Sequence, residues 1–339
     1  MRMKHNKSNN RLTGKNALRA DIKQAWEQDN QAWWDWYVTL ADNSGQKLLD
    51  LVDIPPLPEV ALPSDAEVAE ELSTPFPVTD QQCESFRKDG FIKISNVLSM
   101  GTIKRLRQEL IEMLGNAFQT KLDGGVRNRF LSLEMMWLNN PFIDAYVRSE
   151  RIAKISAQLL NVACVRLYHD NILSKEPGCG RTPWHFDEHH FPLATDDVVT
   201  AWIPAQPIPL NMGPLAFAKP LSISELVKDV PFNKFDTSYD AKISEIFEAH
   251  GVDIVEEAFD IGDVSFHHNR SFHTAGRNQT LKSRVALATT YFGDGARIVD
   301  EPTMVSGDWQ KFIPGALPGD LAKSEFNPIC WRGGKDDRK

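Results

Sequence analysis

The apolar residues in the first part of the chain recur mainly with a helical period. Between residues 99 and 118 they stand three or four positions apart, which predicts a helix with one buried face: Ile103, Leu106, Leu110, Met113 and Ala117. Ser99 is suited to cap the start of this helix. Further helices are predicted over residues 82–88 and 150–160, and an alternating strand over residues 91–94. We interpret these elements as scaffold.

After residue 162 the pattern changes to short apolar stretches that are separated by proline and glycine turns. The predicted strands lie at residues 165–168, 171–175, 198–203, 213–218, 263–267 and 284–292. Many short strands at fairly regular spacing are typical of a β-sandwich or barrel. We therefore expect an α+β fold in which helices support a β-barrel.

The first 79 residues are predicted to be an addition to this core, which would occupy residues 80–339. Residues 1–24 are rich in Lys, Arg and Asn and are expected to form an unstructured tail. Residues 55–77 are rich in Pro, Ala and Glu and are expected to be a linker. Between them, residues 25–52 should form one or two helices that carry a dense aromatic cluster: Trp26, Trp33, Trp34, Trp36 and Tyr37. We interpret this cluster as core packing of the N-terminal addition, and these helices could also supply a homo-oligomeric interface.

Composition and charge exclude several classes of partner. The chain of 339 residues is 42% hydrophobic, carries a net charge of −8 and has no basic stripe interleaved with aromatic residues, so nucleic acid is not an expected partner. Its four cysteines are far apart and form no paired motif, which favours a reducing, cytoplasmic location. Residues 1–23 have no hydrophobic stretch, so we do not expect them to be a secretory signal, and no apolar run approaches the ~20 residues that span a membrane.

The candidate chemistry centres on His185 and Asp187. Residues i and i+2 of a strand project to the same face, so an imidazole and a carboxylate would stand side by side. A further histidine from a distant strand would complete the two-His, one-carboxylate set that binds Fe(II) and leaves positions open for an α-keto acid and O₂. The segment 262–273 offers several histidines, and Arg284 opens the next predicted strand, so adjacent antiparallel strands would place a histidine and the arginine near one another. A guanidinium there could bind a carboxylate of 2-oxoglutarate through two hydrogen bonds.

The motifs that follow one another over residues 80–295 resemble those of the phytanoyl-CoA dioxygenase (PhyH) family of Fe(II)/2-oxoglutarate oxygenases. They include Asp89-Gly90-Phe91, Thr182-Pro183-Trp184-His185-Phe186-Asp187, Gly213-Pro214-Leu215, Gly262-Asp263-Val264, His273-Thr274-Ala275-Gly276-Arg277-Asn278 and Arg284-Val285-Ala286-Leu287. The resemblance implies a double-stranded β-helix (jelly-roll) core. It also implies that Fe(II), 2-oxoglutarate and O₂ are used.

The same resemblance assigns roles to individual residues. His185, Asp187 and His273 would bind the iron, and the neighbouring His267 and His268 are the alternatives to His273. Arg284 would hold the far carboxylate of 2-oxoglutarate. Trp202 would line that pocket, and Lys175 or Thr200 would assist. The expected co-substrate contacts are therefore Arg284, Trp202, Thr200 and Lys175.

The substrate is less constrained by the sequence. Met212 stands where the family usually has Asn, and the stretch after Leu215 also departs from the family pattern, so family substrates are not transferred. Candidate substrate contacts are Met212 and the residues that follow the metal motif, Glu188, His189 and His190. We expect a small organic molecule, such as a natural-product biosynthetic intermediate. The alternatives are a non-catalytic or other-metal β-helix protein (a zinc hydrolase or cofactor-independent dioxygenase) and a peptide hydroxylase.

Overall fold

The computed structural model describes residues 30–38, 50–231, 233, 236–302 and 309–333, which are called the described residues below. The strands are β1 (Phe91–Ile94), β2 (Phe130–Glu134), β3 (Cys164–Lys175), β4 (Thr182–His185), β5 (Val198–Pro204), β6 (Leu215–Lys219), β7 (Asp253–Glu256), β8 (Val264–His268), β9 (His273–Ala275), β10 (Arg284–Gly293) and β11 (Ile329–Arg332). The α-helices are α1 (Asn30–Tyr37), α2 (Asp65–Ser73), α3 (Asp80–Asp89), α4 (Met100–Phe118), α5 (Pro141–Val147), α6 (Glu150–Leu160), α7 (Ile223–Val227) and α8 (Ser238–His250). Short 3₁₀ turns are η4 (Met136–Leu138), η5 (Asp187–His190), η6 (Leu210–Met212) and η8 (Trp309–Lys311).

The strands of the described residues form two antiparallel sheets. The larger sheet has the order β1-β8-β5-β10-β3-β11, with β2 paired to β3, and the smaller sheet has the order β4-β9-β6-β7. Along the chain from β3 to β6, and again from β7 to β10, consecutive strands alternate between the two sheets. This alternation is the topology of a double-stranded β-helix, so the predicted fold class is confirmed.

The two-residue period of the strands separates an outer core from the barrel interior. On β10, Val285 and Leu287 belong to the core beneath the helices, whereas Ala286 and Ala288 belong to a cluster between the sheets. Both sets are buried, which explains why β10 is apolar on both faces. Arg284 has the same parity as the two alanines and therefore points into the barrel.

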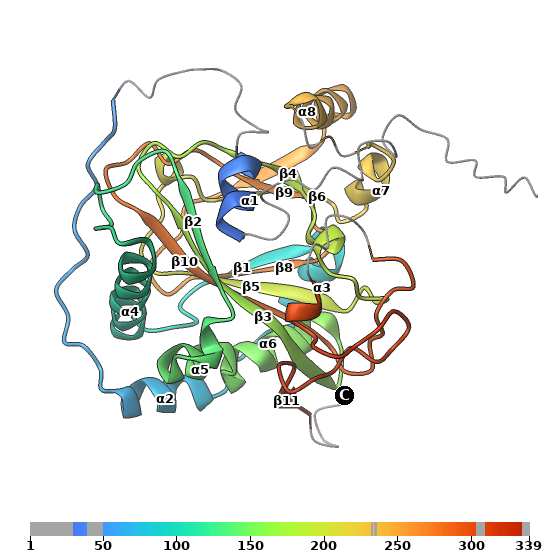
Figure 1. The fold of residues 1–339 in the computed structure, drawn as a ribbon, viewed down its shortest axis with the longest axis horizontal. Coiled ribbons are helices and arrows are strands. Elements are labelled where there is room, and N and C mark those ends of the chain that lie inside the picture. Colours follow the sequence, from blue (N-terminus) through green and yellow to red (C-terminus); the bar gives the residue numbers. More distant parts are fainter. Residues whose placement is uncertain (1–29, 39–49, 232, 234–235, 303–308, 334–339) are drawn as a thin grey trace, which may run out of the picture.

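Helices α2, α4, α5 and α6 cover the outer face of the larger sheet, and α8 lies beside the smaller one (Figure 1). The predicted helix after Ser99 is confirmed as α4, and Ser99 caps it by accepting a hydrogen bond from the Thr102 backbone N–H. Helix α6 has the predicted bounds. None of the helices in the described ranges has the length and apolar character to cross a bilayer. The four cysteines are free thiols.

Two local expectations were wrong. The stretch expected to be a linker contains helix α2, which begins with a capping box between Ser64 and Glu67 and buries Val68 and Leu72 against the outer core. The two strands predicted over residues 165–175 are one continuous strand, β3, which pairs along most of its length with β10. Within the predicted aromatic helices, residues 25–29 and 39–49 lie outside the described residues, as does the N-terminal tail.

Candidate active site

Three ligand-type side chains converge at one end of the smaller sheet. His185 is the last residue of β4 and lies directly across from His273, the first residue of β9. The Nε2 atoms of His185 and His273 are 3.7 and 3.9 Å from Oδ1 of Asp187, respectively. The three ligand atoms all lie within 4.8 Å of one another, so one metal ion could contact them all. Asp187 does not continue the strand as expected, but opens the 3₁₀ turn η5.

The two imidazoles are oriented by backbone carbonyls. Nδ1 of His185 lies 2.8 Å from the Pro183 carbonyl oxygen, and Nδ1 of His273 lies 3.0 Å from that of Ser271. A carbonyl can only accept, so each Nδ1 carries the proton and each Nε2 lone pair faces the cluster. Burial lowers the pKa of both histidines, which favours the neutral form that binds a metal.

The second oxygen of Asp187 is held by two residues of the larger sheet. Oδ2 lies 3.3 Å from Nε2 of His267 and accepts a 3.3 Å hydrogen bond from the Thr200 hydroxyl. His267 and Thr200 are cross-strand partners on β8 and β5. Burial acts to raise the pKa of Asp187, but the hydrogen bond from His267 and the adjacent histidines outweigh it and hold the pKa well below its usual range. The carboxylate is therefore ionised, with Oδ1 directed toward the two ligand-type imidazoles.

A pair of buried cations lies beyond the metal cluster. Arg284 and Lys175 face one another across β10 and β3, and each side chain is at most 1% exposed. The Arg284 guanidinium donates to the Gly213 carbonyl at 2.7 Å and lies 5.3 Å from the Trp202 ring, while its Nε has no hydrogen-bond partner among the described residues. Lys175 donates to Thr182 and to two backbone carbonyls of residues 275 and 276. None of the ion pairs among the described residues includes either side chain. Burial and the neighbouring Arg284 lower the pKa of Lys175 well below its usual range, so the uncompensated positive charge of the pocket lies on the Arg284 guanidinium.

The metal cluster and the guanidinium are close in the barrel. Thr200, which contacts Asp187, and Trp202, which contacts Arg284, are successive inward-facing residues of β5. Two residues of strand span about 7 Å. A short dicarboxylate could therefore reach from the metal to Arg284. The donor set of two neutral imidazoles, one carboxylate and a buried guanidinium fits Fe(II) with 2-oxoglutarate.

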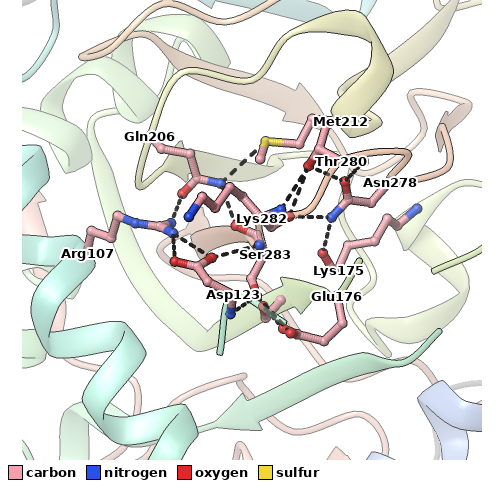
Figure 2. Close-up of polar contacts among 11 residues, drawn as sticks. Arg107, Asp123, Lys175, Glu176, Gln206, Met212, Asn278, Thr280, Lys282 and Ser283 are labelled. Atoms are coloured by element: carbon pink, nitrogen blue, oxygen red, sulfur yellow. Dashed lines mark hydrogen bonds and ion pairs between the residues drawn. The ribbon is translucent and has the colours of Figure 1, made fainter. Parts of the chain in front are cut away.

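A polar network fixes the strand ends that carry Arg284 and Lys175 (Figure 2). The Ser283 hydroxyl donates to Glu176 at 2.7 Å, and the Ser283 backbone N–H donates to Asp123 at 2.9 Å. Asp123 in turn pairs with Arg107 of α4 at 3.2 Å. Because Ser283 and Glu176 are the residues next to Arg284 and Lys175, this network holds the backbone from which both cations project.

The route by which His273 and Arg284 approach the site differs from the expected one. We expected them on adjacent antiparallel strands, but His273 lies on β9 of the smaller sheet and Arg284 on β10 of the larger sheet. The strand predicted to deliver several histidines, β8, brings only His267 to the cluster. His268 packs near Phe86 instead, with ring centroids 6.3 Å apart.

The other predicted contacts lie around the metal cluster at different depths. The His190 ring centroid is 6.3 Å from that of His185, whereas His189 packs on Phe186 at 4.4 Å. Glu188 is half-buried in η5, which raises the pKa of its carboxyl. Met212 is fully buried within the cluster of apolar side chains that surrounds Trp202.

Two residues at the site, His267 and Tyr37, have other roles in the structure than the sequence indicated. His267 was considered only as an alternative ligand, yet it contacts the carboxylate Asp187. Tyr37 of α1 was interpreted as packing, yet its ring lies 5.8 Å from that of His185. The aromatic cluster was visible in the sequence, but no local pattern indicates which part of the core it covers.

A double-stranded β-helix with a His-Asp-His cluster and a buried arginine defines an Fe(II)/2-oxoglutarate-dependent oxygenase, which is the class to which this enzyme belongs. The family model of phytanoyl-CoA dioxygenase (PhyH) matches residues 86–286. The chain therefore belongs to the phytanoyl-CoA dioxygenase family, as the motifs predicted. Helix α1 lies outside the matched region.

Individual relatives are distant in sequence. The peroxisomal phytanoyl-CoA dioxygenase of Mus musculus is 23% identical over 260 residues, which cover 70% of this chain and 73% of the relative. Among solved structures, the α-ketoglutarate-dependent carbocyclase SnoK from nogalamycin biosynthesis matches with a TM-score of 0.61 and 22% identity, covering 76% of this chain and 99% of SnoK. The epimerase SnoN, in complex with Fe³⁺, α-ketoglutarate and nogalamycin RO, matches with a TM-score of 0.58 and 20% identity, covering 74% of this chain and 98% of SnoN.

Proposed function

We propose that His185, Asp187 and His273 hold Fe(II), that Arg284 binds the far carboxylate of 2-oxoglutarate, and that the enzyme oxidises a C–H bond of a small organic molecule. The observation that carries this proposal is the convergence of three ligand atoms within 4.8 Å beside a buried guanidinium that lacks an acidic partner. In a purely structural cluster, carboxylates and histidines usually pair only with one another. Here the three ligand atoms could bind a metal cation, and the guanidinium could bind an anionic carboxylate.

The residues of the chain prepare the site before any ligand arrives. The Pro183 and Ser271 carbonyls fix the two imidazole tautomers, and His267 with Thr200 fixes the Asp187 carboxylate. Arg284 and Trp202 orient the co-substrate at its far end. When bound, iron together with 2-oxoglutarate and O₂ supplies the oxidising power, which no side chain of the protein can provide.

The presence of Asp187 bears on the outcome of the reaction. Related halogenases have a small residue at this position, which leaves room for chloride beside the iron. With a carboxylate there, hydroxylation or a related oxidation such as desaturation, epoxidation or ring rearrangement is favoured. The substrate that we propose is a natural-product biosynthetic intermediate, because the similar structures SnoK and SnoN come from nogalamycin biosynthesis.

Anaerobic reconstitution tests this proposal. Fe(II) and then 2-oxoglutarate are added without O₂, and the weak visible charge-transfer band of the chelated complex is recorded. We expect the band in the wild-type protein and its loss in His273→Ala, while His268→Ala, a matched histidine outside the cluster, retains it. Candidate small molecules are then screened for substrate-dependent succinate release. A wild-type protein that binds Fe(II) but gives no band with 2-oxoglutarate would refute the proposal.

A further inference from the structure

Helix α1 is attached to the barrel by contacts that imitate a neighbouring strand. β2 pairs with β3 on one side. On its other side, the Gln31 side-chain amide donates to the Phe130 carbonyl at 2.6 Å and its oxygen accepts from the Ser132 backbone N–H at 3.1 Å. In a strand the C=O of residue i and the N–H of residue i+2 point the same way, so one glutamine amide satisfies both.

An ion pair and an aromatic stack reinforce this attachment. Asp35 accepts two hydrogen bonds from Arg129, at 3.1 Å to Nε and 2.7 Å to a terminal nitrogen. Trp34 stacks on Phe130 with ring centroids 4.3 Å apart and an interplanar angle of 17°. The Arg284 guanidinium also lies over the Phe130 ring, 5.9 Å from its centroid. Helix α1 is therefore seated against the wall of the predicted co-substrate pocket.

The next turn of α1 reaches the metal cluster itself. Tyr37 is 2% exposed, and its ring meets the His185 ring at 89° with centroids 5.8 Å apart. Trp33 stacks on Tyr37 at 4.3 Å and meets His190 edge-on at 5.4 Å. Burial raises the pKa of the Tyr37 hydroxyl, and Asp187 is among the charged groups that raise it further. Two aromatic rings from the N-terminal helix thus adjoin the predicted metal ligand His185 and its neighbour His190.

We propose that α1 is part of the active site, with Trp33 and Tyr37 forming the wall against which the substrate binds. This inference rests on the proposed function, since it requires the metal at His185. Tyr37 is buried and would support the wall, whereas Trp33 is only partly buried and offers its ring to a ligand. A wall of two stacked rings binds an apolar or aromatic surface best, so the preferred substrate carries a flat, apolar ring portion.

The position of α1 can be tested with a metal alone. Mn(II) in the iron site broadens the NMR signals of nearby nuclei, and Zn(II) serves as the diamagnetic reference. With ¹⁵N-labelled tryptophan, assigned through single Trp→Phe variants, we expect Mn(II) to remove the indole signals of Trp33, Trp184 and Trp202. Trp331 on β11 lies at the far end of the larger sheet (Figure 1) and should retain its signal.

The outcomes separate the two proposals. If Trp184 and Trp202 lose their signals while Trp33 keeps its own, the metal site stands and the inference on α1 is overturned. If Mn(II) affects none of the three, no metal binds at His185 and both proposals fall.

A second experiment asks whether α1 faces the reacting atoms. The enzyme is supplied with Fe(II), 2-oxoglutarate and O₂ but no further substrate, and peptides are mapped by mass spectrometry. A ring C–H of Trp33 or Tyr37 would become C–OH while 2-oxoglutarate is converted to succinate and CO₂, with one oxygen atom of O₂ entering the new hydroxyl group and the other entering succinate. We expect a gain of one oxygen on the tryptic peptide of residues 24–47.

A detached helix should escape this oxidation. Replacing Gln31 and Asp35 together with alanine removes the hydrogen bonds to β2 and the ion pair with Arg129, leaving the Trp34–Phe130 stack, and we expect the oxidised fraction of the peptide to fall at least threefold. Asp65→Ala removes a comparable surface pair with Arg105 and should leave that fraction unchanged. A wild-type enzyme that consumes 2-oxoglutarate without oxygen gain in this peptide would overturn the proposal, as would equal oxidation in the double variant.

Discussion

Replacing Arg284 with lysine tests the anion site while keeping its charge. Arg284 is 1% exposed, one terminal nitrogen is committed to Gly213, and Nε has no partner among the described residues. A carboxylate bound by the guanidinium through two hydrogen bonds would keep only one with a lysine ammonium. A hydrogen bond to a charged group contributes about 1.5–3 kcal/mol. Losing one should therefore weaken 2-oxoglutarate binding roughly 10- to 150-fold.

The assay is an anaerobic titration of the Fe(II)-loaded protein with 2-oxoglutarate, followed through the visible charge-transfer band. The control is Arg297→Lys, because Arg297 likewise donates to a glycine carbonyl, that of Gly319 at 2.8 Å, but is exposed rather than buried in the pocket. Iron affinity should be unchanged in both variants. If Arg284→Lys gives the wild-type midpoint, the guanidinium does not bind the co-substrate and the assignment of the pocket is wrong.

Three further predictions concern the carboxylates and His267. Asp187→Ala should abolish both the charge-transfer band and succinate release, and normal iron binding in this variant would show that Asp187 is not a ligand. His267→Ala should weaken Fe(II) binding about 10- to 100-fold, because it removes the contact that holds Oδ2 of Asp187. His267→Gln retains a hydrogen-bond donor and should recover most of this loss in a Fe(II) titration. Equal losses in the two variants would argue for a purely steric role of His267. Burial raises the pKa of Asp170 to about 7 from its usual value of 3.8, so the folded state binds an extra proton at this carboxyl, and the contribution of Asp170 to stability should fall by up to about 4 kcal/mol between pH 4 and pH 7. Asp170→Asn should remove this contribution, so the difference in unfolding free energy between wild type and variant should shift by that amount between pH 4 and pH 7 in denaturant unfolding; a difference that does not change with pH would show that Asp170 titrates normally.

The elements that the sequence predicted well are those in which local pattern and tertiary burial agree. Helix α4 has both a serine cap and a regular apolar face, and β10 has a continuous buried run. Helix α2 was missed because prolines surround it and it is short, with only Val68 and Leu72 buried, although the Ser64–Glu67 capping box could have indicated it.

The site was predictable where a motif carries the information. His185, Asp187 and His273 are brought together as expected, but the sheet that each occupies was not readable from spacing. His267 and Thr200 meet Asp187 only because β8 and β5 pair in one register. The approach of Tyr37 to His185 depends on the docking of α1 to β2, which is a contact between segments about a hundred residues apart. Such contacts have no local signature.

The division of the chain at residue 79 and the homo-oligomeric interface stay predictions. Two of the aromatic side chains that could have formed such an interface, Trp34 and Tyr37, contact their own barrel instead. Helix α1 is thus bound to the core domain rather than separate from it, even though the family match begins only at residue 86.

The central claim is that one metal ion joins His185, Asp187 and His273. Crystals grown without O₂ and soaked with Fe(II) and 2-oxoglutarate would be measured by anomalous diffraction at the iron edge. We predict a single strong peak at bonding distance from Nε2 of both histidines and from Oδ1 of Asp187, with the co-substrate extending to Arg284. A peak bound through His267 instead of His273, or iron located elsewhere, would contradict the claim.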